Sequence, residues 1–153
     1  MAGNSRLATA IHVTGMLSFA EQMPLTSEAI AQSCNTNPVV IRRIIGLLAR
    51  AGLVRVKMGI GGGASLNKKP EEITLGDIYA ALDEGPVFEV PQFDEEFHCQ
   101  VGKVVRPVLA DVLRQAEEGL VEKLNSLTLF EVIGQVKTKM HENCSHREHK
   151  VKE

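Results

Sequence analysis

The feature of this sequence that most constrains its fold is a turn of about three residues, Cys34-Asn35-Thr36, between two predicted helices. Thr26 is expected to cap the first helix. Asn37 is expected to cap the second, with Pro38 at the first helical position, where the missing N–H costs no hydrogen bond. Gly52 is well placed to end this second helix. Two helices joined this tightly predict a helix-turn-helix.

The residues that follow predict a small β-hairpin. Leu53–Lys57 alternates apolar and polar side chains, which is typical of a half-buried strand. A glycine-rich run, Gly59–Gly63, predicts a flexible tip, and Ala64–Leu66 can return as the second strand. Another helix is expected at the start of the chain, from Ser5 to about Gln22. This order of elements predicts a winged helix-turn-helix.

The rest of the chain predicts a loop and further helices. Thr74 and Asp77 have the spacing of a capping box, and residues 85–100, with their prolines and acids, predict a loop. The longest predicted helix runs from Pro107 to about Leu127 and is about 30 Å long. A leucine-rich stripe follows this helix at Leu109, Leu113, Ala116, Leu120, Leu124 and Leu127. Such a seam usually packs on a partner helix, and a second copy of the chain is the simplest partner.

The predicted fold class is therefore mainly α with a small two-stranded β wing: a winged helix-turn-helix followed by a long dimerisation helix. A short last helix is expected over residues 128–136. The predicted organisation is a DNA-binding domain (1–84), a linker or sensor region (85–106), dimerisation helices (107–140) and a disordered polar tail (141–153).

Charge is unevenly distributed along the chain. Residues up to Pro70 contain eight Lys or Arg and two acids, a net charge of +6, whereas the remainder contains nine Lys or Arg and 17 acids, a net charge of −8. The overall charge of −2 conceals this polarity. A basic half suggests that this part of the protein meets a polyanion.

The basic residues of the predicted helix-turn-helix and wing are candidates for DNA contacts. Arg42 can match the two acceptors of a guanine edge, and Val39 can touch a thymine methyl group. The full set of candidates is Thr36, Asn37, Pro38, Val39, Arg42, Arg43, Arg50, Arg55, Lys57, Gly61, Gly62 and Lys68. Two alternatives remain: the arginines are merely solvated, or the helix-turn-helix is a protein-interaction module that docks an acidic partner. Binding to double-stranded DNA would fall steeply with salt.

The chain also resembles the Rrf2 family of bacterial winged-helix transcriptional regulators, which includes IscR, NsrR and CymR. The segments that carry the resemblance are Thr26–Ala31, Asn37–Ile44, Leu48–Val54, Gly59–Leu66 and Pro70–Ile78. The resemblance extends through the long helix to Thr128-Leu129. It implies a homodimer, crossed through the long helices, that binds palindromic operator DNA and usually represses transcription.

Two residues depart from the family pattern. The family often has an aromatic residue in the wing where this chain has Ala64. Members that bind an iron–sulfur cluster have three cysteines before and into the long helix, whereas this chain has Cys99 alone there. A cluster requires several thiolate or nitrogen ligands, so no cofactor is expected, and an iron–sulfur-sensing regulator stays an alternative.

Two cysteines suggest redox sensing. Cys34 lies next to the second helix of the predicted helix-turn-helix, the reading helix, which starts at Pro38. The positive N-terminus of this helix, together with Arg42 or Arg43, could lower the pKa of the thiol. Oxidation of Cys34 or Cys99 by an oxidant or electrophile would then change operator affinity. The alternative is that Cys34, four residues after Ile30, is a small core residue.

Other readings of the sequence are weaker. Gly59–Ala64 matches the letters of a dinucleotide-binding fingerprint, but the helix that the fingerprint requires cannot begin before Pro70. The Cys and His residues after Met140 lack the spacing of a zinc site, so no metal site is expected. The paired acids Glu95-Glu96 and Glu117-Glu118 are interpreted as solvated surface. Without a catalytic motif, export signal or membrane span, we expect a cytoplasmic protein that is not an enzyme.

Overall fold

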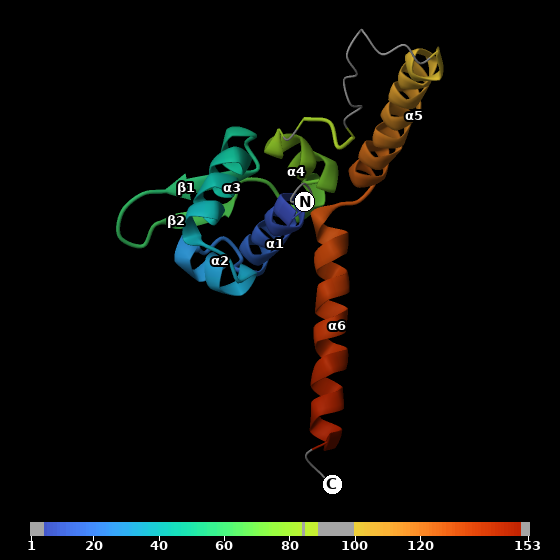
Figure 1. Cartoon of the computed structure of the whole chain (residues 1–153). Coiled ribbons are helices and arrows are strands. Elements are labelled where there is room, and N and C mark those ends of the chain that lie inside the picture. The colour runs from blue at the N-terminus through green and yellow to red at the C-terminus, as the bar shows by residue number, and fades with distance from the viewer. Residues whose placement is uncertain (1–4, 84, 89–99, 151–153) are drawn as a thin grey trace.

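The computed structural model describes residues 5–83, 85–88 and 100–150 (Figure 1). The elements follow the order α1 (Ser5–Phe19), α2 (Ser27–Cys34), α3 (Pro38–Arg50), β1 (Val54–Lys57), β2 (Gly63–Leu66), the 3₁₀ turn η1 (Pro70–Glu72), α4 (Leu75–Leu82), α5 (Gln100–Asn125) and α6 (Leu129–Lys150). The predicted fold class is confirmed: the structure is mostly helical, with one two-stranded antiparallel sheet. No helix in the described part of the chain could cross a membrane.

Local hydrogen bonds explain where α2 and α3 begin and end. Thr26 Oγ1 accepts a hydrogen bond from the Ala29 N–H at 3.2 Å, and Asn37 Oδ1 accepts one from the Val39 N–H at 2.8 Å. These two caps are the ones that the sequence predicts. Asn35 adopts the left-handed conformation at φ 47° and ends α2, so that α3 can start three residues later.

The core lies where α1, α3 and α4 meet. One face of α3, formed by Ile41, Ile44, Ile45 and Leu48, is buried against the neighbouring helices, and the buried side chains of α1 include Ala10, Val13 and Leu17. The beginning of α6 closes this core with Leu129 and Ile133. Such burial supplies most of the driving force for folding.

The wing pairs β1 with β2 in the register Val54↔Leu66 to Lys57↔Gly63. Leu25 adds a short third pairing. Its N–H donates to the Ala64 carbonyl, and its carbonyl accepts from the Ala64 N–H, each at 2.9 Å. Gly63 lies so close to this segment that a Cβ atom would stand 2.6 Å from the Leu25 carbonyl oxygen. Only glycine therefore fits at this crossing.

The helix α5 begins earlier than the sequence predicts. The prediction placed its start at Pro107, but it starts at Gln100, so residues 100–106 belong to the helix and not to the expected linker of 85–106. Proline most often begins a helix because it has no N–H to donate, and here it lies inside one. The overlooked signal is a run of valines at helical spacing: Val101, Val104, Val105 and Val108.

The last helix is also longer than predicted. The sequence predicted a short helix over residues 128–136 and a disordered tail from 141, whereas α6 runs from Leu129 to Lys150. The segment after Gly134 contains no Gly or Pro, so nothing in it breaks the helix. Its side chains are largely polar, so it lacks the apolar periodicity on which the prediction relied. Figure 1 shows α5 and α6 extending in opposite directions from a junction beside the winged helix-turn-helix.

A close approach joins α4 to the end of α5. A Cβ atom at Gly76 would lie 1.8 Å from Asn125 Oδ1, so a side chain at this position would collide with α5. The Leu75 N–H donates to the Leu127 carbonyl at 2.8 Å, and the Leu129 N–H donates to the Ile73 carbonyl at 2.8 Å. The C-terminal helices are thus bonded directly to the start of α4.

Candidate nucleic-acid interface

The outward face of α3 presents the predicted reading residues to solvent. Val39 is 61% exposed, and Arg42, Arg43 and Arg50 are also exposed. The opposite face of the same helix is buried, so α3 is fixed in place and only its basic side is accessible. This arrangement has the geometry that a recognition helix needs to place side chains at base edges.

The backbone N–H groups at the N-terminus of α3 already have hydrogen-bond partners within the chain. The Val39 and Val40 N–H groups donate to Asn37 Oδ1 and to the Asn37 carbonyl, at 2.8 and 2.9 Å. The Thr36 N–H donates to the Ala31 carbonyl at 3.0 Å. Phosphate contacts at this end would therefore come from side chains, namely the Asn37 amide and the Thr36 hydroxyl, more readily than from backbone amides. Pro38, half-buried, starts the helix.

Arg42 is not a free side chain. Its Nη2 donates to Oε1 of Glu28, which lies in the first turn of α2. The pKa of Glu28 is lowered, first by a hydrogen bond from its own backbone N–H and second by this contact with Arg42. The sequence placed both residues on helices but gave no signal that they pair. An acid and a base 14 residues apart meet only because the turn brings α2 and α3 together.

Arg55 is exposed, but two of its N–H groups bind other side chains of the domain. Its Nε donates to Ser65 Oγ at 2.9 Å and its Nη2 donates to Gln22 Oε1 at 2.6 Å. The sequence predicts Arg55 as one of the DNA contacts. The structure shows that its guanidinium links β1, β2 and the turn after α1, so two of its N–H donors are already used.

The wing tip combines cations with exposed apolar side chains. Lys57 and Lys68 are exposed as predicted. Gly61 has a φ of +71°, and a Cβ at Gly62 would lie 2.3 Å from the Lys57 carbonyl oxygen. Met58 and Ile60, which no motif in the sequence marks, are among the most exposed apolar side chains described, and Ile60 is fully exposed.

Cys34 does not have the reactive environment that the sequence suggested. The thiol is half-buried and packs against the core, and this burial raises its pKa, contrary to the predicted lowering. A raised pKa reduces the thiolate fraction at neutral pH, and the thiolate is the reactive form. Cys99, the other predicted sensor, lies outside the described residues.

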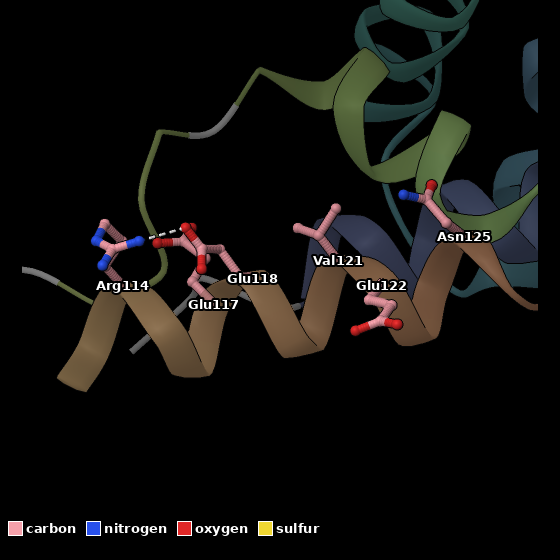
Figure 2. A pocket seen from close by; sticks show the side chains of 6 residues that line it. All are labelled: Arg114, Glu117, Glu118, Val121, Glu122 and Asn125. Atoms are coloured by element: carbon pink, nitrogen blue, oxygen red, sulfur yellow. Dashed lines mark hydrogen bonds and ion pairs between the residues drawn. The ribbon is translucent and has the colours of Figure 1, made fainter. Parts of the chain in front are cut away.

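The middle of α5 carries a hollow of about 560 Å³ (Figure 2). Glu117, interpreted from the sequence as solvated, is half-buried, and its Oε1 accepts hydrogen bonds from the Val87 N–H at 3.0 Å and from the Tyr79 hydroxyl at 3.4 Å. Figure 2 shows the Arg114–Glu118 pair, 2.6 Å apart, beside it. This carboxylate therefore binds the segment after α4 to α5.

The N-terminal half of α5 exposes an apolar stripe. It consists of Val101, Val104, Val105, Val108 and Val112, and the first four line an open groove of about 410 Å³. The predicted leucine seam lies about a quarter turn away around the helix. Its last members, Leu124 and Leu127, pack on the core of the same chain. Leu109 and Leu120, earlier members of the seam, are 44% and 37% exposed, so the valine stripe and this part of the seam are both open to a partner.

Comparison with known proteins identifies the family. Residues 4–135 match the model of the Rrf2 family, described as iron-dependent transcriptional regulators. Among the residues that the structure describes, the donor side chains do not fit an iron site. In the parts of the chain that the structure describes, no three His, Cys, Asp or Glu residues are grouped to hold a metal, and Cys34 packs on the core. The sequence between residues 85 and 106 supplies one cysteine.

Relatives match over most of their length. YwnA of Bacillus subtilis, which is named an HTH-type transcriptional regulator, is 36% identical over 130 residues, covering 85% of this chain and 96% of YwnA. CymR of B. subtilis, also named as such a regulator, is 30% identical over 69% of this chain and 70% of CymR. The solved structure of CymR, the global cysteine regulator of B. subtilis, has the same fold, with a TM-score of 0.64, 24% identity and coverage of 86% of this chain and 95% of CymR. This chain therefore belongs to the Rrf2 family and is a DNA-binding transcriptional regulator, not an enzyme.

Proposed function

We propose that this regulator is a cytoplasmic homodimer that represses transcription by placing the α3 helices of its two copies in successive major grooves of a palindromic operator. The observation that carries the proposal is that α3 and α5 each leave one face uncovered: the arginine face of α3 and the valine stripe of α5. The first suits a polyanion and the second suits another apolar surface.

The valine stripe supports self-association. Val101, Val104 and Val108 are 70%, 63% and 56% exposed, and their spacing places them on one side of α5. An apolar helix face in water is stabilised when another helix covers it, and an identical helix offers a matching stripe. In a symmetric pair the two reading helices would meet half-sites one helical turn apart, about 34–36 Å.

Analytical ultracentrifugation of the full chain tests the dimer. The double variant Val104→Lys, Val108→Lys should sediment as a monomer, because it places charges on the stripe. The control is Ala110→Lys, which adds a cation to an exposed position on the opposite side of α5 and should leave the dimer intact. A dimer that survives the double variant would exclude the valine stripe as its interface.

DNA binding is tested with a duplex that the protein itself selects from a random pool. The selected sequences should be palindromic, and reporter expression from a promoter that overlaps such a site should fall when the regulator is produced. Selected sites without twofold symmetry would contradict binding as a symmetric dimer.

Thiol sensing through Cys34 and Cys99 stays a prediction. An oxidant or electrophile should change the affinity for the selected duplex, and Cys34→Ser or Cys99→Ser should suppress the change. Because burial raises the pKa of Cys34, the effect of Cys99→Ser is expected to be the larger. An affinity that is the same before and after peroxide treatment would end the redox hypothesis.

A further inference from the structure

The ion pair between Glu28 and Arg42 stands on the outside of the helix-turn-helix. Arg42 Nη2 donates to Glu28 Oε1 across the α2–α3 junction. The side chains of Arg42 and Glu28 are 58% and 59% exposed, so solvent and any docked molecule reach both of them. Within the described part of the chain, the Arg42 guanidinium forms its hydrogen bond with Glu28 and with no other residue.

The position of Glu28 is unfavourable for general attraction to DNA. Residues up to Pro70 contain eight Lys or Arg and two acids, and Glu28 is the acid that lies beside the reading helix. A carboxylate next to a phosphate-binding surface cancels one of its cations. The stability gained from an ion pair this exposed is small. Glu28 also favours the start of α2, where its carboxylate accepts a hydrogen bond from its own backbone N–H. That role requires no arginine, so the pairing itself points to control of Arg42.

We propose that Glu28 is a positioning residue that makes the DNA interface selective: its carboxylate retains one amino group of Arg42 and leaves the remaining donors for a guanine edge. This inference rests on the proposed binding of operator DNA by α3. A guanidinium has five N–H donors, and two of them suffice for the O6 and N7 acceptors of guanine. Arg42 can thus keep its bond to Glu28 while it reads a base.

Selectivity arises on DNA that lacks a guanine at the matching position. There an unpaired arginine would turn to a phosphate and release a counterion, which strengthens binding to any sequence. Held by Glu28, Arg42 gains less from such a contact because its charge is already compensated. The pair therefore disfavours wrong sequences more than the right one. The pKa of Glu28 is lowered, so the carboxylate is charged at neutral pH and the pair persists.

The test measures the affinities of the wild-type chain and of Glu28→Gln for two duplexes: one selected by the wild-type protein from a random pool, and a scrambled duplex of equal composition. Glu28→Gln should bind the scrambled duplex about tenfold more tightly, with the slope of log affinity against log salt steeper by about 0.9. Its affinity for the selected duplex should change less than about threefold, so the selectivity ratio falls.

Two further variants separate positioning from simple charge removal. Glu21→Gln removes the other acid of the basic half, and it should leave the selectivity ratio unchanged because Glu21 makes no contact with Arg42 in the structure. In an Arg42→Ala background, Glu28→Gln should have no effect on the ratio. Far-UV circular dichroism and the thermal midpoint establish that each variant is folded.

The outcomes separate this inference from the proposed function. An equal loss of selectivity in Glu21→Gln, or a loss that persists without Arg42, would overturn the role of Glu28 and leave DNA binding intact. An unchanged ratio in Glu28→Gln would do the same. A wild-type chain that binds no duplex with salt-dependent affinity would instead refute the proposed operator binding itself.

Discussion

Arg55 Nε donates to Ser65 Oγ at 2.9 Å, directly across the β1–β2 pair, in which these two residues are register partners. Ser65 is 4% exposed, so its hydroxyl depends on this arginine for a partner outside its own strand. Arg55, which the sequence predicts to contact DNA, therefore also stabilises the wing.

Replacing Arg55 by alanine should destabilise the protein. The buried Ser65 hydroxyl would lose its partner, which costs about 1–2 kcal/mol in the free energy of unfolding. Urea unfolding followed by circular dichroism measures the loss. Lys57→Ala, which removes an exposed cation from the same strand and leaves the Ser65 hydrogen bond in place, is the control and should change stability by less than about 0.5 kcal/mol. Equal losses in the two variants would show that the Arg55 contact contributes nothing.

Gly62→Ala should weaken DNA binding by changing the shape of the wing. The added Cβ would lie 2.3 Å from the Lys57 carbonyl oxygen and 2.8 Å from that of Gly59, so the tip must rearrange. If the wing supplies one or two phosphate contacts, affinity for the selected duplex should fall by about tenfold. Fluorescence anisotropy with a labelled duplex measures the change.

The control for this substitution is Gly134→Ala in α6, where nothing lies within 4 Å of the added atom. Alanine is the better helix former, so this variant should raise stability by up to about 1 kcal/mol and leave DNA affinity unchanged. Unaltered affinity in Gly62→Ala would mean that the wing does not contact the duplex.

Single substitutions of basic residues should separate sequence reading from phosphate binding. Lys68→Ala should weaken binding to all duplexes alike and reduce the salt slope by about 0.9, since an exposed lysine neutralises one phosphate. Arg42→Ala should instead relax the sequence choice at one position of each half-site. Affinity that depends little on salt would favour the alternative of a module that docks an acidic protein partner.

Stability should fall at low pH through Glu131. Its pKa is lowered from the ordinary value of 4.5, first by the Thr128 backbone N–H and then by the Thr128 hydroxyl, at 2.7 and 2.9 Å. A depressed pKa in the folded state means that the carboxylate stabilises the fold above 4.5 and that this contribution is lost as pH falls through the folded value.

Thermal midpoints at neutral pH and below 4.5 test this prediction. Glu131→Gln should show a smaller drop between the two conditions than the wild type, because it has no proton to take up. The exposed Glu142→Gln on the same helix should retain the wild-type drop. Identical drops in all three proteins would exclude a contribution from Glu131.

The elements of the winged helix-turn-helix could be predicted because their signals are local. Thr26 and Asn37 form the caps that their residue types favour, and the buried face of α3 follows the spacing of its isoleucines. Where the signal was ambiguous, the prediction was wrong. Pro107 usually marks a helix start and here lies inside α5, and the polar second half of α6 has no apolar pattern to follow.

The site could be predicted only in outline. The exposure of the arginines on α3 follows from helix periodicity. The partner of Arg42, however, lies 14 residues away in the sequence, and the two partners of Arg55 lie 10 and 33 residues away. Such pairings depend on how the helices and strands pack, which no spacing in the sequence encodes. The raised pKa of Cys34 has the same origin, since it comes from the burial of the thiol against the core.

The contact between Gly76 and Asn125 has a geometrical consequence for a dimer built on α5. The absence of a side chain at Gly76 lets the last turn of α5 rest against the first turn of α4, and α4 packs in the same core as α3. In the proposed dimer, this contact and the backbone hydrogen bonds of Leu75 and Leu129 beside it would set the tilt between α3 and the dimer axis. A larger residue at position 76 would push the end of α5 away from α4. The number of base pairs between the two half-sites that fit the proposed dimer would then change.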